Sequence, residues 1–76
     1  MPLISLNTRA IIEECIEHAI RVRLDYTDCV RRAVHILCSV EPEASRTDAW
    51  QVTEALMAET LGRRASEQFA ALATRH

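Results

Sequence analysis

Apolar side chains in residues 7–40 recur at the spacing of an amphipathic helix. Stepped at about 100° per residue, they fall on one face, which we call the N-terminal stripe: Ile11, Ile12, Cys15, Ile16, Ala19, Val22, Tyr26, Cys29, Val30, Ala33, Val34, Leu37 and Val40. Glu13, Glu14 and Glu17 occupy the opposite face. The segment contains neither Gly nor Pro, and Asn7 or Thr8 can cap its start. The pattern therefore predicts helix throughout residues 7–40.

Two architectures fit this stripe. The phase of the pattern continues through its middle, where only Arg23 intrudes, and this favours one long helix. The alternative is a hairpin of two helices, in which Asp25 or Thr27 caps the second helix. We favour the long helix, because a turn normally resets the phase and recruits a Gly or Asn to end the first helix.

The second half of the chain predicts two shorter helices. The linker Glu41–Ser45 contains Pro42, and Ser45 with Asp48 three residues later resembles a capping box that opens a helix to about Leu61. Gly62 is expected to end that helix. A last helix over residues 63–75 would bury Ala65, Phe69, Leu72 and Ala73. The predicted fold is a single all-α domain over residues 1–76: a small helical bundle with a long N-terminal helix, or helical hairpin, and two shorter helices packed on it.

The length of the N-terminal helix predicts association. A helix over residues 7–40 would be about 50 Å long, roughly twice the length of the next one, so part of its stripe would stay uncovered. We expect Ile11, Ile12, Cys15, Ile16 and Ala19 to bind a second copy or a dedicated protein partner, with Arg63 and Arg64 contacting partner carboxylates. The hairpin alternative permits a compact four-helix monomer and weakens this expectation.

Composition limits the compartment and the partner class. The net charge of −2 and the pI of about 5.9 do not suit generic coating of nucleic acid. No apolar run reaches the length of a membrane span, and no secretory signal is apparent. An odd number of cysteines fits a reducing compartment. We therefore expect a cytoplasmic protein without membrane contact. All nine basic residues are Arg, which suggests a GC-rich bacterial or phage gene.

The residues that could carry chemistry do not converge. Cys15 and His18, with His35 and Cys38, form a zinc-like ligand set, but helical rotation turns the two pairs apart. No nucleophile has an ordered base, and one glycine cannot build a phosphate-binding loop. We expect no enzyme activity, no cofactor and no metal.

The sequence therefore favours a small protein-protein interaction module, acting as an adaptor, an inhibitor or a regulatory subunit that occludes a partner, as a homodimer. One alternative is a helix-turn-helix-like transcriptional regulator that binds DNA with the segment from Ala58 to Arg75, where Arg63 and Arg64 follow Gly62. Another, on size and class alone, is an inhibitor encoded by a mobile element, such as an anti-CRISPR protein.

Overall fold

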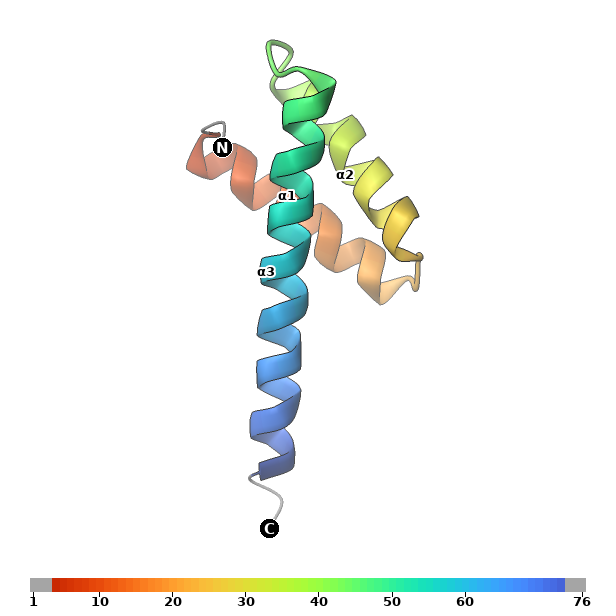
Figure 1. The fold of residues 1–76 in the computed structure, drawn as a ribbon, viewed down its shortest axis with the longest axis vertical. Helices are drawn as coiled ribbons and strands as arrows, with labels where there is room; N and C mark the ends of the chain where they lie inside the picture. Colours follow the sequence, from red (N-terminus) through yellow and green to blue (C-terminus); the bar gives the residue numbers. More distant parts are fainter. Residues whose placement is uncertain (1–3, 74–76) are drawn as a thin grey trace.

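A computed structural model describes residues 4–73 of the chain. It contains helices α1 (Leu6–Arg21), α2 (Tyr26–Val40) and α3 (Arg46–Ala73), and no strand within these residues. Each helix packs against the other two. Figure 1 shows α1 and α2 gathered around one end of α3, which is the longest element. The predicted all-α bundle is confirmed, and its long helix lies at the C-terminal side of the chain.

The favoured single helix over residues 7–40 is wrong, because the chain turns between α1 and α2. Arg23 adopts the left-handed conformation with φ 64°. Its backbone N–H donates to the Ile20 carbonyl at 3.0 Å, and the N–H of Leu24 donates to the Ala19 carbonyl at 3.1 Å. These two bonds form a Schellman motif, in which an arginine occupies the position usually held by glycine. Asp25 then caps α2, accepting from the Asp28 N–H at 2.8 Å.

Serines cap the other two helices. Ser5 Oγ accepts from the Thr8 N–H at 3.1 Å, so Ser5 caps α1, rather than Asn7 or Thr8 as expected from the sequence. Thr8 is buried inside α1 and donates its hydroxyl to Glu41 at 2.8 Å. Ser45 Oγ accepts from the Asp48 N–H at 3.0 Å, which confirms the predicted start of α3.

The predicted break at Gly62 is also wrong, because α3 continues through it to Ala73. Gly62 has no positive φ, and a Cβ placed on it would meet nothing within 4 Å. An interior glycine costs a helix only about 1 kcal/mol relative to alanine, and its neighbours Leu61, Arg63 and Arg64 are good helix formers. The segment from Ala58 onward therefore contains no turn of a helix-turn-helix within the described residues.

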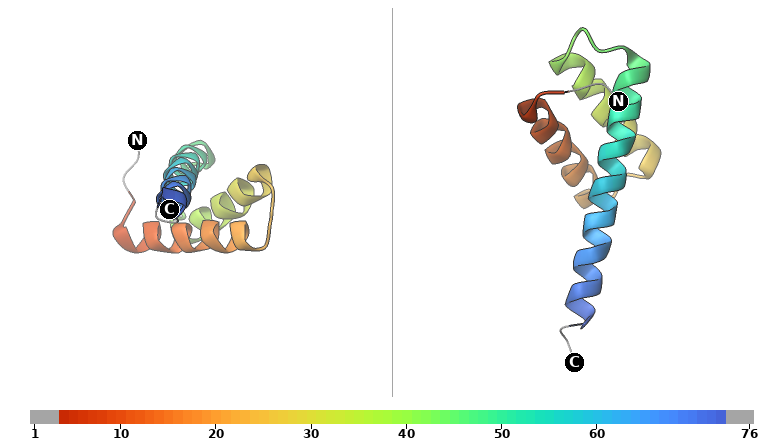
Figure 2. Two further views of the ribbon diagram at one scale, coloured as in Figure 1. Left: turned by 90° about the horizontal axis from the view of Figure 1, so that it is seen from below. Right: turned by 60° about the vertical axis from the view of Figure 1, so that its left-hand side comes forward.

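The core lies between α1, α2 and the first half of α3. Its buried apolar residues are Ile12, Ile16, Ala19, Cys29, Val30, Ala33, Val34, Leu37, Ala49, Val52, Leu56 and Met57. The hairpin folds the two halves of the N-terminal stripe toward each other, so most of that stripe lines one core. At 1.5 Å per residue, α3 is about 42 Å long and α1 only about 24 Å. The end of α3 therefore extends past the bundle (Figures 1 and 2), and the molecule measures 50 × 23 × 18 Å.

Candidate functional site

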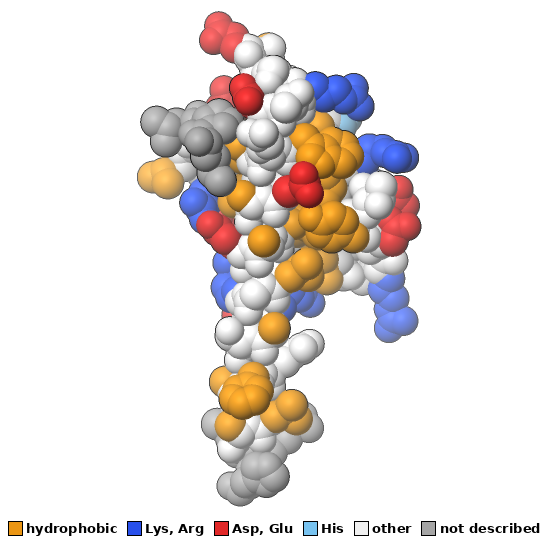
Figure 3. Space-filling model, in the orientation of Figure 1, with side chains coloured by type: hydrophobic (Ala, Val, Ile, Leu, Met, Phe, Trp, Pro, Cys, Tyr) orange, Lys and Arg blue, Asp and Glu red, His pale blue; other side chains and the backbone are white. Residues whose placement is uncertain are grey.

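The projecting part of α3, residues 61–73, is the most unusual surface of the molecule, and we call it the arm. Every arm residue is exposed except Arg64, which is half-buried. The exposed fractions of its large apolar side chains are 43% for Leu61, 76% for Phe69 and 60% for Leu72. Figure 3 shows hydrophobic side chains on this projecting end. The expectation that Phe69, Leu72 and their alanine neighbours would be buried by the chain itself is therefore wrong.

The apolar side chains of the arm form a second stripe. Leu61, Ala65, Phe69 and Leu72 are three or four residues apart, which places them along one side of the helix. At 100° per residue, this arm stripe lies roughly 145° around α3 from the mean direction of the buried residues of that helix, Ala49, Val52, Thr53, Leu56, Met57 and Thr60. No charged residue falls within it. The long helix thus buries one face against the bundle and leaves an apolar face bare on the opposite side.

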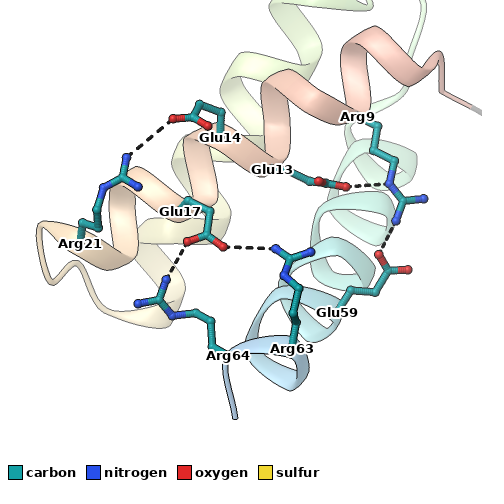
Figure 4. Close-up of polar contacts among 8 residues, drawn as sticks. All are labelled: Arg9, Glu13, Glu14, Glu17, Arg21, Glu59, Arg63 and Arg64. Carbon is teal, nitrogen blue, oxygen red and sulfur yellow. Dashed lines mark hydrogen bonds and ion pairs between the residues drawn. The ribbon is translucent and has the colours of Figure 1, made fainter. Parts of the chain in front are cut away.

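Ion pairs fix the base of the arm to α1 (Figure 4). Glu17 accepts from Arg63 at 3.2 Å and from Arg64 at 2.6 Å, and its side chain is only 24% exposed. Exposed ion pairs contribute at most about 1 kcal/mol each, so their main effect is to orient the arm. Arg63 and Arg64, expected to contact partner carboxylates, here bind a carboxylate of their own chain.

A second bridge lies farther up the same junction. Arg9 bonds Glu13 of α1 at 2.7 Å and also reaches Glu59 of α3. The hydrogen bond that Arg9 donates to Glu13, followed by the charge of Glu59, raises the pKa of the Arg9 guanidinium. Both bridges join the charged side of α1 to α3, which leaves the arm stripe clear of them.

The structure does not leave the N-terminal stripe bare. Ile12, Ile16 and Ala19 are each 0% exposed and belong to the core. Of the five stripe residues expected to bind a partner, only Ile11 is exposed, at 40%, and Cys15 is half-buried. The exposed face was predicted for a continuous helix, and the turn at Arg23 removes it by letting α2 cover α1.

The four residues of the zinc-like set do not form one cluster, and Cys38 is half-buried against the core. Cys15 and His18 line a shallow hollow between α1 and α2 together with Arg32 and Ile36, and His35 is exposed elsewhere on α2. Within residues 4–73, no group of three or more His, Cys, Asp or Glu side chains is arranged to hold a metal ion. Burial raises the pKa of the Cys15 thiol, and the nearby Arg32 charge opposes that effect.

Comparison with protein-family models, curated proteins and solved structures finds no match to this chain. Among the described helices, none is both long and apolar enough to cross a membrane. The arm thus becomes the candidate site on geometry alone. Its signal was present in the sequence as the spacing of Leu61, Ala65, Phe69 and Leu72, but the expected break at Gly62 concealed it.

Proposed function

We propose that the chain is a small protein-protein interaction module that binds a partner polypeptide through the arm of α3. The observation that carries the proposal is the bare arm stripe, in which Phe69 is 76% exposed and which no other part of the described chain covers. Apolar patches of this kind on small proteins mark surfaces that another molecule covers. The module would act as an adaptor, an inhibitor or a regulatory subunit by occupying its partner's surface.

The helical state of the arm also supports this proposal. An isolated helix as short as the arm is marginal in water, because propagation barely offsets nucleation and few side chains stabilise it. Here the arm continues from a packed helix, so nucleation has already occurred, and Glu17 holds its base through Arg63 and Arg64. The bundle therefore presents a preformed apolar helix, which lowers the entropy cost of binding.

Site-directed photo-crosslinking tests the proposal. A photoreactive phenylalanine analogue replaces Phe69, and in a matched control it replaces Glu54, which is exposed on the bundle half of the same helix. Both variants are produced in cells that naturally make the chain, and the adducts are identified by mass spectrometry. We expect a discrete adduct from position 69 and none from position 54. Excess wild-type chain should suppress this adduct by competition, whereas excess Phe69→Asp variant should not.

The crosslinking results that agree with the proposed function differ from those that contradict it. An adduct with any single polypeptide, including a second copy of this chain, agrees with the proposed function. Equal labelling from Phe69 and Glu54, or labelling that Phe69→Asp suppresses as well as the wild type does, would show that the arm is not a binding surface.

A further inference from the structure

We infer that the partner of the arm is a second copy of this chain, paired antiparallel with the two-fold axis beside Glu67. This inference rests on the proposed function and specifies its partner. In such a pair, each residue that precedes Glu67 lies level with the residue an equal number of positions after Glu67 in the second copy. The register is set by the sizes of the side chains along the arm.

Large and small residues face each other throughout this register. Phe69 lies level with Ala65 of the second copy, and Leu72 lies level with Gly62. Gly62, Ala65 and Ser66 are spaced as three corners of the four-residue hole that receives a knob from a facing helix. All three are small, and the fourth corner of the hole is Phe69 of the same arm, so the ring of Phe69 from the second copy enters the small side and packs beside that ring. By the two-fold symmetry, each arm supplies one knob and one hole.

Gly62 has a role in this arrangement that the single chain does not require. Its backbone is ordinary helix, and a Cβ there would meet no atom of its own chain. A glycine in an exposed helix costs about 1 kcal/mol relative to alanine. In the antiparallel pair, Gly62 gives room to Leu72 of the second copy, and close helix approach accounts for its presence.

Charge and shape permit the pair. Arg63, Arg64 and Glu67 all project away from the arm stripe, and two of them are directed toward α1 by Glu17. No like charges therefore meet at the seam. The bundle packs on the other face of α3, so the two bundles lie at opposite ends of the dimer without colliding.

A parallel pair fits these residues poorly. It would place identical residues level, so Phe69 would meet Phe69, and Gly62 and Ala65 would each meet their own kind. One level would be overfilled and two would be left with voids, and both faults are unfavourable in a packed seam. The size pattern thus distinguishes the two orientations.

Small-angle scattering across a dilution series tests the inference with the wild-type chain. The monomer is 50 Å long. Two copies overlapped along their arms would extend to roughly 75 Å, whereas a parallel pair would stay near the monomer length. As concentration rises, we expect the mass to double and the maximum dimension to increase to that of the antiparallel pair. A chain that stays monomeric at every accessible concentration, or a dimer of the shorter length, would overturn the inference.

Variants of the facing residues test the register. Phe69→Ala removes the knob and leaves the hole of the second copy empty, and Ala65→Phe fills that hole. Each variant should therefore raise the dissociation constant of the dimer at least tenfold. Together they exchange the large and small positions, and the double variant should recover part of the lost association. Glu67→Gln, outside the stripe, is the matched control and should leave association unchanged. These side chains are exposed in the single chain, so circular dichroism should show the fold intact in all four variants. Failure of the double variant to improve on both single variants would refute the register.

The two proposals can fail separately. If crosslinking from Phe69 yields a different polypeptide while the purified chain remains monomeric, the arm binds a partner and self-pairing is wrong. If crosslinking yields nothing specific and the chain is monomeric, both are wrong.

Discussion

The left-handed residue at the α1–α2 turn gives the sharpest test of the fold, through the substitution Arg23→Gly. Arg23 has φ 64° and is exposed, so its side chain has no packing role to lose. A non-glycine residue pays roughly 1–2 kcal/mol for the left-handed conformation. Glycine avoids that cost but gives the unfolded chain extra freedom worth about 0.5–1 kcal/mol. The net expectation is a gain in the free energy of unfolding of about 0.5–1 kcal/mol.

If residues 7–40 formed a continuous helix, the same substitution would change the free energy of unfolding in the opposite direction. There, glycine would replace a good helix former in the interior and would lower the free energy of unfolding by roughly 1 kcal/mol. Equilibrium denaturation in urea, followed by circular dichroism and by Trp50 fluorescence, measures the difference as a shift in midpoint at constant slope. Arg31→Gly, which changes the same residue type at an exposed position inside α2, is the matched control and should be destabilising. A lower midpoint for Arg23→Gly would refute the hairpin.

Three further predictions concern the interior and the arm junction. Thr53 is fully buried and its hydroxyl has no hydrogen-bond partner among residues 4–73, so Thr53→Val should raise the free energy of unfolding by about 1 kcal/mol. Thermal denaturation measures this gain, and Thr47→Val, at an exposed position, is the control. Glu17→Gln should release the base of the arm, and hydrogen exchange of the amides in residues 61–73 should accelerate, whereas Glu14→Gln should leave it unchanged. Burial, and then the charges of two nearby aspartates, raises the pKa of the Cys29 thiol. Its proton is therefore lost first from the unfolded chain, and stability should fall as pH rises through the ordinary thiol pKa; Cys29→Ala should reduce that fall in denaturation midpoints measured above neutral pH.

The buried faces of this fold could be predicted from spacing alone. Ile12, Ile16, Val30 and Val34 fall on the N-terminal stripe and all belong to the core. The connection between the two halves could not be predicted the same way. The stripe keeps its phase across the turn, because the residues in the turn happen to advance the pattern by nearly whole helical turns. A periodicity argument therefore cannot tell a bent helix pair from a straight helix.

The residue types that usually end or continue a helix were misleading at two positions, for the same physical reason. Arg23 turns the chain although glycine is preferred there, since two backbone hydrogen bonds and the Asp25 cap support the turn. Gly62 continues the helix although glycine often ends one, because its neighbours Leu61, Arg63 and Arg64 are good helix formers and its backbone φ is not positive. At each position, the preference for or against glycine is worth only about 1 kcal/mol. Neighbouring contacts are therefore strong enough to determine whether the helix ends there.

The candidate site was hidden by these errors. When Phe69 and Leu72 are placed on a separate short helix, they have a bundle to pack against. On a continuous helix they extend beyond it. The arm could be recognised only after the direction of α3 beyond Gly62 was known.

Because one uninterrupted helix carries both the core face and the arm stripe, binding and folding share a thermodynamic cycle. A ligand that covers Phe69 would disfavour opening of α3 from its C-terminal end, and such opening would also release Thr60 and Met57 from the interior. By mass action, a ligand that binds only the ordered helix raises the apparent stability in proportion to the logarithm of its concentration. The melting temperature of this protein should therefore report on occupancy of a surface that lies outside its core.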